Sequence, residues 1–152
     1  MLLAALILGT IGLVLYNEYI ESKRVYPSRT RDLIPELMNK VHMLAYSSNE
    51  PVFVKLQKSL GKISIYSGSS SYTVDKQHIY LCLSDRSGNF YDMNTLMDVV
   101  LHEVSHVICD ELDHTAEFNR IFRILKAQAN VIGIYDSSIP FDRSYCSGCG
   151  CS

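Results

Sequence analysis

Two histidines and a glutamate within residues 102–106 have the types and the spacing of a metal-dependent catalytic site. The segment reads His-Glu-x-x-His, with His102, Glu103 and His106. In a helix, the two histidines lie one turn apart on the same face and can bind one metal ion together. Glu103 then lies about 100° around the helix, from where it can reach a water molecule on that metal. The motif therefore predicts hydrolysis by a metal-activated water.

A third candidate ligand, His114, follows eight residues after His106. Catalytic zinc sites usually have three protein ligands and keep a fourth position open for water. His102, His106 and His114 would supply these three ligands, so zinc is the expected cofactor. Glu117 is an alternative third ligand, because a carboxylate oxygen also suits zinc.

A site of this kind also needs supporting groups. Each metal-binding imidazole requires an acceptor for its second ring nitrogen, and the nearby acids are candidates: Asp98, Asp110 and Asp113. An oxyanion-stabilising donor is required as well. Tyr135 is a candidate for that role, with packing at the surface as the alternative.

The segment that carries the motif has the pattern of an amphipathic helix. Residues 95–110 contain neither Gly nor Pro, and Asn94 is a suitable N-cap residue. Apolar residues recur at helical spacing, at Leu96, Val100, Val104 and Val107. Such a helix buries its apolar stripe in a core and turns the histidines toward a cleft.

The flanking segments predict an α+β domain over residues 32–136. Apolar residues at helical spacing predict further helices over about 32–46, 52–60 and 115–132, and the second of these could also be a strand. Alternating residues predict three short strands, at 62–67, 72–74 and 77–84. We expect the strands to form a short antiparallel sheet. This sheet should pack on the helix that carries the His-Glu-x-x-His motif and on the helix that follows it.

Residues 1–16 form an unbroken run of apolar and small residues, which can be extended through residue 20. We expect a transmembrane anchor over residues 1–20 that contacts the lipid bilayer, followed by a polar juxtamembrane linker over 21–31. Basic residues such as Lys23 and Arg24 follow the run, so the positive-inside rule predicts a single-pass protein with a cytoplasmic C-terminal domain. A cleaved signal peptide and a buried N-terminal helix are the alternatives.

Residues 137–152 form a tail without periodicity that holds three of the five cysteines. Cys146, Cys149 and Cys151 could bind a second metal ion, form a disulfide or carry a lipid. A fourth zinc ligand is missing within the tail, so a closed zinc site there needs a residue from elsewhere.

The other two cysteines, Cys82 and Cys109, lie in apolar segments and are expected to be buried thiols.

The two histidine motifs together resemble the minimal zinc metallopeptidases of the SprT and WLM type. The pattern of that group is His-Glu-x-x-His, a short connector, and then His-x-x-x-Phe at the start of the next helix. Here it is matched by residues 102–106 and by His114 with Phe118. The resemblance covers about residues 63–132. It implies a small zincin-like domain in which the three histidines bind zinc, Glu103 is the general base and Phe118 packs beside them.

The resemblance also implies peptide-bond hydrolysis. Several members of the group cleave DNA-bound proteins. We do not expect that activity of this chain, because it has a net charge of −2 and lacks an obvious basic patch. We therefore expect no direct nucleic-acid binding. The sequence predicts a membrane-anchored zinc endopeptidase that acts on proteins or peptides, with Glu103 as general base.

Two other functions remain open. The first is a zinc-stabilised structural protein of a membrane or virion that has lost turnover and has assembly partners there. Small membrane-anchored proteins with such domains also resemble products of large DNA viruses. Glu103 favours activity over this alternative, because zinc binding alone does not require it. The second is a redox protein that acts through the cysteine tail.

Overall fold

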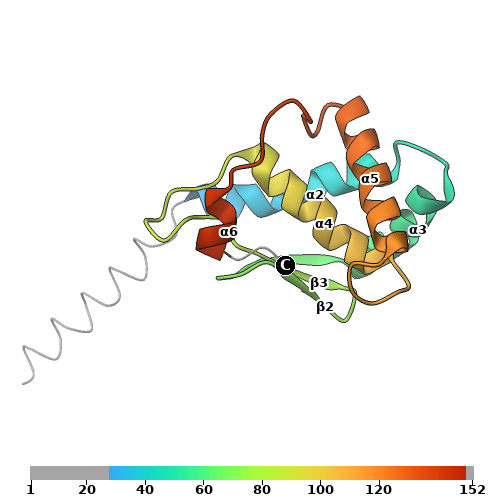
Figure 1. Ribbon diagram of the computed structural model, residues 1–152, viewed down its shortest axis with the longest axis horizontal. Helices are drawn as coiled ribbons and strands as arrows, with labels where there is room; N and C mark the ends of the chain where they lie inside the picture. The colour runs from blue at the N-terminus through green and yellow to red at the C-terminus, as the bar shows by residue number, and fades with distance from the viewer. Residues whose placement is uncertain (1–27, 150–152) are drawn as a thin grey trace, which may run out of the picture. The chain divides into compact units, whose positions relative to one another are not determined.

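Helix α4 (Met93–Ile108), which carries the His-Glu-x-x-His motif, is the element on which the fold is built (Figure 1). It contacts helices α3 and α5 and strands β2 and β3. This computed structural model describes residues 28–149. The chain divides into two units, Met1–Leu33 and Ile34–Ser152, and the second unit contains α4 and the strands.

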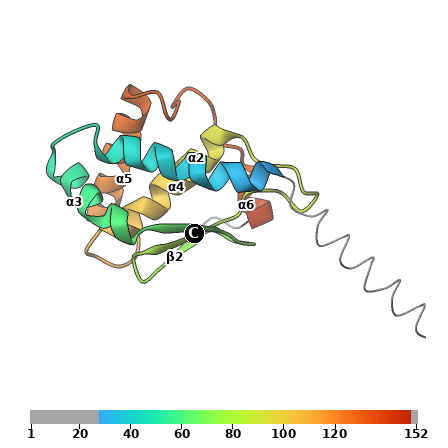
Figure 2. The ribbon, with the colours of Figure 1, turned by 180° about the vertical axis from the view of Figure 1, so that it is seen from behind.

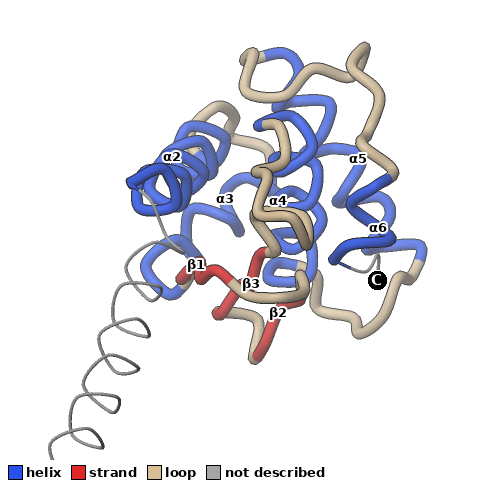
Figure 3. Tube along the Cα trace, turned by 90° about the vertical axis from the view of Figure 1, so that its left-hand side faces the viewer, coloured by secondary structure: helices blue, strands red, loops and turns tan. Residues whose placement is uncertain are grey.

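The fold of the second unit is α+β. The other helical elements are α2 (Ser28–Ala45), α3 (Pro51–Ser59), the 3-10 turn η1 (Leu60–Lys62), α5 (Ala116–Val131) and α6 (Ser144–Cys149). The strands are β1 (Ser64–Ser67), β2 (Tyr72–Val74) and β3 (His78–Leu81), and they lie along one side of the helices (Figure 3). The predicted helices and strands are thus confirmed in type. Helix α2, however, begins inside the predicted linker, and the tail contains the short α6.

The sheet is mixed, so the prediction of an antiparallel sheet is wrong. Its order is β1-β3-β2, with β1 parallel to β3 and β2 antiparallel to β3. After β1, residues 68–71 carry the chain past the position that β3 later fills. Alternation of side chains tells which residues share a face, but it carries no information about the order of the strands.

The two faces of the sheet have different surroundings. Ile65 and Ile79 pair in register on the inner face and are 8% and 0% exposed. Full burial of such a side chain stabilises a fold by about 1.5–3 kcal/mol. On the outer face, Tyr66, Tyr80 and Tyr72 pair in register and stack, with ring centroids 5.3 and 4.8 Å apart. The inner face of the sheet therefore packs against the core, and the three tyrosines cover the outer face of the sheet.

Helix α4 is capped by Asp92, not by Asn94 as predicted. The Asp92 carboxylate accepts hydrogen bonds from the Thr95 backbone N–H at 2.9 Å and from the Thr95 hydroxyl at 2.7 Å. Asn94 lies inside the first turn, where its side chain accepts a hydrogen bond from the Asp136 backbone N–H at 2.7 Å. The predicted apolar stripe is buried: Leu96, Val100 and Val104 are all 0% exposed, and Val107 is 7% exposed.

Helices α2 and α5 contribute buried side chains to the same core as α4. From Ile34 onward, α2 lies behind α4 in Figure 1 and in front of it in Figure 2, and its Leu37, Val41 and Leu44 are fully buried. Helix α5 contacts α4 with a buried stripe that includes Phe118 and Leu125. The remaining face of α4 carries His102 and His106 and contributes to the candidate metal centre.

Among residues 28–149, no helix is both long and apolar enough to cross a bilayer. The predicted transmembrane anchor over residues 1–20 lies outside the described residues. The predicted fold class and localisation are corrected accordingly. The described fold is an α+β domain without a membrane-spanning helix, and it gives no support to the predicted single-pass placement.

Candidate metal centre

Three imidazoles converge beside the sheet, as the sequence predicted. His102 and His106 come from successive turns of α4, and His114 comes from the connector between α4 and α5. One ring nitrogen of each lies within 4.8 Å of the other two, and the Nε2 atoms of His102 and His114 are 3.0 Å apart. Ligand atoms around a tetrahedral zinc with bonds of about 2.0–2.1 Å lie about 3.3 Å from one another. The donor type and the spacing therefore fit one zinc ion.

Phe118 packs against all three imidazoles. Its ring centroid lies 4.9 Å from that of His102, 4.3 Å from that of His106 and 4.7 Å from that of His114. The side chain is 1% exposed, and its backbone N–H donates to the N-capping hydroxyl of Thr115 at 3.2 Å. The start of α5 thus fixes a rigid aromatic surface under the three rings.

The surroundings keep the imidazoles of α4 neutral. Burial lowers the pKa of His102 to about 4, helped by repulsion from His106 and His114. Burial also lowers the pKa of His106, with further contributions from His114 and Lys76. Both rings are therefore unprotonated at neutral pH, which is the form that binds a metal ion.

Glu103 is almost completely buried, with 1% of its surface exposed. The Thr73 hydroxyl on β2 donates to Glu103 Oε2 at 2.7 Å. Burial raises the pKa of Glu103, and the hydrogen bond from Thr73 partly offsets this effect. Oε1 accepts no hydrogen bond from the residues that the structure describes. One carboxylate oxygen is thus held by the sheet while the other remains available to a water molecule.

Thr73 is a site residue that the sequence analysis missed. It pairs with Ile79 on the inner face of the sheet, which directs its side chain toward α4. A three-residue strand is too short for alternation to reveal which of its side chains points inward. The contact depends on β2 lying at the edge of the sheet beside α4, which the sequence did not predict.

A cleft of about 670 Å³ opens onto the site. One wall is formed by β2 and its turn, including Thr73, and the other by the connector that carries His114. Glu103 and His106 line its base. The predicted cleft on the histidine face of α4 is therefore present.

Other predicted site residues have partners elsewhere. Glu117, the alternative ligand, forms a two-pronged ion pair with Arg120 at 2.8 and 2.7 Å and is not part of the histidine cluster. The Tyr135 hydroxyl donates to Asp98 Oδ2 at 3.2 Å, and Lys126 donates to the same oxygen at 2.9 Å. The proposed oxyanion donor is thus engaged with a carboxylate.

Among the described residues, none of the three candidate acceptors, Asp98, Asp110 and Asp113, accepts a hydrogen bond from the imidazoles. Asp98 is held by Lys126, and Asp110 pairs with Lys55 at 2.6 Å. Within the described part of the chain, no carboxylate accepts a hydrogen bond from the three histidines.

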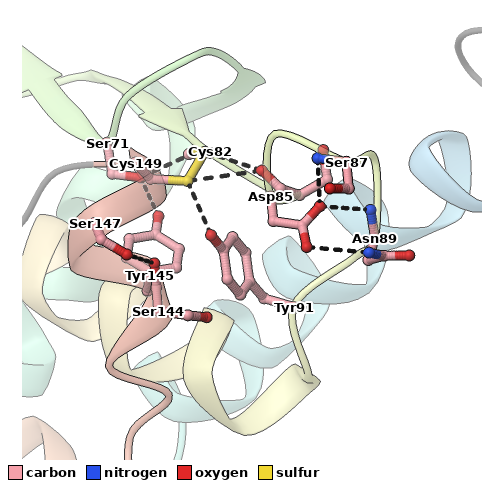
Figure 4. Close-up of a disulfide and its surroundings, with 11 residues drawn as sticks. Ser71, Cys82, Asp85, Ser87, Asn89, Tyr91, Ser144, Tyr145, Ser147 and Cys149 are labelled. Carbon is pink, nitrogen blue, oxygen red and sulfur yellow. Dashed lines mark hydrogen bonds between the residues drawn. A yellow bond between two sulfur atoms is a disulfide. The ribbon is translucent and has the colours of Figure 1, made fainter.

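A disulfide joins Cys82, just after β3, to Cys149 in α6 (Figure 4). The two Cα atoms are 5.7 Å apart and the residues are 67 positions apart in sequence. A disulfide was one of the alternatives for Cys149, but the expectation of a free thiol at Cys82 is wrong. Cys109 is a buried free thiol, as predicted. Cys151 and the side chain of Cys146 lie outside the described residues.

Polar contacts near this disulfide connect α6 to the residues that flank the strands. Tyr145, 1% exposed, shares a hydrogen bond with the Ser71 hydroxyl, which also accepts from the Cys82 backbone N–H at 2.9 Å (Figure 4). The Tyr91 hydroxyl lies 3.7 Å from Cys149 Sγ. Ser71 directly precedes β2, so the tail is connected to the strand that holds Glu103.

Comparisons find similar proteins in viruses. Over 142 residues the chain is 36% identical to Uncharacterized protein 042R of Invertebrate iridescent virus 3, which covers 86% of this chain and 88% of that protein. It is 42% identical over 90 residues to Uncharacterized protein 136R of Invertebrate iridescent virus 6, covering 57% of this chain and 51% of the relative. It is 32% identical over 126 residues to Uncharacterized protein R325 of Acanthamoeba polyphaga mimivirus, and this match covers 78% of this chain and 61% of that protein. No protein-family model and no solved structure matches the chain.

Proposed function

We propose that this chain, which belongs to the same family as Uncharacterized protein 042R of Invertebrate iridescent virus 3, is a zinc-dependent endopeptidase. The observation that carries the proposal is the convergence of three imidazole nitrogens within 4.8 Å, next to a buried glutamate. The resemblance of residues 102–106 and of His114 with Phe118 to the SprT and WLM peptidases supports it from the sequence.

The protein's own groups have distinct tasks in this reaction. When bound, zinc lowers the pKa of a water molecule to about 7 and polarises the scissile carbonyl. His102, His106 and His114 would hold the ion through one ring nitrogen each. Glu103 takes the proton of the attacking water on Oε1 and passes it to the leaving nitrogen, a transfer that suits a carboxyl group whose pKa is raised by burial.

The edge of the sheet favours an extended peptide as the substrate. Strand β2 is the edge strand beside the cleft, and its Tyr72 and Thr73 line that cleft. An edge strand has unpaired backbone groups that can pair with an extended chain. A peptide that pairs there runs past Glu103 and the histidines.

The test is a comparison of the wild type with Glu103→Gln. We expect both proteins to bind one zinc ion per chain and only the wild type to cleave an unfolded, fluorescence-quenched protein substrate. The rate of the variant should fall by at least about 100-fold, the usual contribution of a general base. A chelator should abolish the wild-type activity, and added zinc should restore it.

Glu117→Gln is the matched control, because its carboxylate pairs with Arg120 outside the histidine cluster. This variant should retain both zinc and cleavage. If neither the wild type nor Glu103→Gln cleaves while both bind zinc, the proposal fails, and a zinc-stabilised structural protein becomes the better account.

A further inference from the structure

The cleft over the metal centre has an acidic rim. Asp75, in the turn between β2 and β3, and Glu111 and Asp113, in the connector after α4, line it and are exposed. Within the part of the chain that the structure describes, none of the three forms an ion pair. Three carboxylates therefore line the cleft, each without an ion pair among the described residues.

The only lysine or arginine among the described cleft residues is Lys76, and backbone carbonyls hold its amine at the end of α4. The Lys76 amine donates to the backbone carbonyls of Cys109 and Asp110, the latter at 3.1 Å. These carbonyls follow the last turn of α4, where the helix dipole favours a positive charge. Lys76 thus stabilises the end of α4, and its single positive charge offsets only one of the three rim carboxylates.

The same cleft offers apolar surface and a buried acceptor. Leu112 is 75% exposed and Tyr72 is 45% exposed, and both line the cleft. Long cationic side chains bury their aliphatic stems on such surface while the charged end stays in water. At the base, Glu103 is 1% exposed, and its Oε1 has no hydrogen-bond donor among the described residues, which independently marks the cleft as a place for a ligand.

We propose that this cleft selects polypeptide segments in which lysine or arginine flanks the bond at the metal centre. The inference rests on the proposed function for the position of the scissile bond. The stems of these side chains pack on Leu112 and Tyr72, and their charged ends lie near Asp75, Glu111 and Asp113.

Binding to the full-length, zinc-loaded Glu103→Gln protein tests the inference without requiring turnover. Two fluorescent peptides of equal length are compared, one with lysines and one with glutamates on both sides of the central bond. We expect the lysine peptide to bind at least about tenfold more tightly, as two or three exposed ion pairs would give. Higher ionic strength should reduce the difference, because exposed charges are screened.

The rim itself is tested by combining Asp75→Asn, Glu111→Gln and Asp113→Asn in the Glu103→Gln protein. Asp75 and Asp113 have positive φ angles of 51° and 64°, a conformation that asparagine also tolerates. The backbone should therefore be retained. We expect the preference for the lysine peptide to disappear.

The matched control removes three exposed acids away from the cleft, by Glu36→Gln, Glu50→Gln and Asp142→Asn. It changes the net charge equally and should retain the preference. Equal binding of the two peptides, no binding of either, or equal loss in both triple variants would overturn the inference. Cleavage by the wild type is scored separately: a protein that prefers the lysine peptide but cleaves nothing retains this specificity and loses the proposed function.

Discussion

Thr73 is the residue whose role follows most directly from the geometry of the site. Its hydroxyl donates to Glu103 Oε2 at 2.7 Å, across 30 residues of sequence. This hydrogen bond fixes the orientation of a buried carboxylate whose other oxygen faces the cleft. In the proposed reaction Thr73 is a positioning residue, because it acts through Glu103 and does not touch the reacting atoms.

Replacement of Thr73 by valine keeps the shape of the side chain and removes the hydroxyl. A hydrogen bond to a charged group contributes about 1.5–3 kcal/mol, so we expect kcat to fall roughly tenfold or more. KM and the zinc content should stay near the wild-type values, because valine keeps the shape of the side chain at the cleft and the zinc ligands do not change. Steady-state kinetics and metal analysis measure these quantities.

Thr73→Ser is the control for this change, since it retains the hydroxyl and should keep most of kcat. A Thr73→Val protein with the wild-type kcat would show that Glu103 does not need this partner. A Thr73→Val protein that loses zinc would show that the residue supports the metal centre instead.

At the residue scale, the sequence predicted the parts of the site that are close in the chain. His102, Glu103 and His106 are related by one turn of a helix, so their spacing alone was sufficient. His114 was found because a histidine with Phe118 follows at a short distance. Thr73 was missed because its contact depends on the pairing of distant strands, which residue types do not encode locally.

Among the elements, α4 depends on its N-cap for a defined start. Burial alone would raise the pKa of Asp92, but hydrogen bonds from the Thr95 backbone N–H and hydroxyl outweigh it and hold the pKa below its usual value of 3.8. A carboxylate of this kind stabilises the folded state above the pKa of the unfolded chain. The stabilisation is lost as the pH falls through the folded-state pKa.

We expect Asp92→Ala to lower the free energy of unfolding by about 1 kcal/mol at pH 7, the usual contribution of an N-cap. The difference from the wild type should shrink as the pH falls below 3.8 and through the lowered folded-state pKa, where the wild-type carboxylate becomes protonated. Urea unfolding at several pH values measures this difference.

Glu50→Ala provides the comparison, since Glu50 is at the N-cap of α3 but makes no capping hydrogen bond through its side chain. Its loss should change stability only slightly. An equal effect of the two substitutions would contradict the assigned role of Asp92.

The same cap illustrates the limits of the sequence at the scale of elements. Asn94 and Asp92 are both good N-cap residues, and only the position of the first turn decides between them. The type of each helix and strand predicted within residues 32–136 was confirmed, because apolar spacing reflects burial on one face. The mixed sheet was not predicted, because the order of β1, β3 and β2 depends on how the chain crosses between strands.

Over the whole molecule, the disulfide between Cys82 and Cys149 closes a covalent loop that contains the three histidines of the candidate metal centre. All three histidines lie between these cysteines in the sequence. Closing a loop with a separation of 67 residues removes unfolded-state entropy worth about 4 kcal/mol in the chain-entropy model. The spacing of the cysteines within the tail could not predict this pairing, because the partner of Cys149 is Cys82, which precedes the three histidines in the sequence.

A reducing agent should therefore lower the melting temperature of the wild type substantially. The double variant with Cys82→Ser and Cys149→Ser should melt at the lower temperature with or without the reducing agent, which excludes effects at other cysteines. A wild-type melting temperature that does not respond to reduction would contradict the assigned disulfide.

The most direct measurement is zinc stoichiometry and affinity, by competition with a chromogenic chelator, for the wild type, His114→Ala and Glu117→Ala. The account predicts one zinc ion per wild-type chain, an affinity lower by roughly 100-fold or more in His114→Ala, and an unchanged affinity in Glu117→Ala. A wild-type chain that binds no zinc, or a His114→Ala variant that binds it as tightly as the wild type, would contradict it.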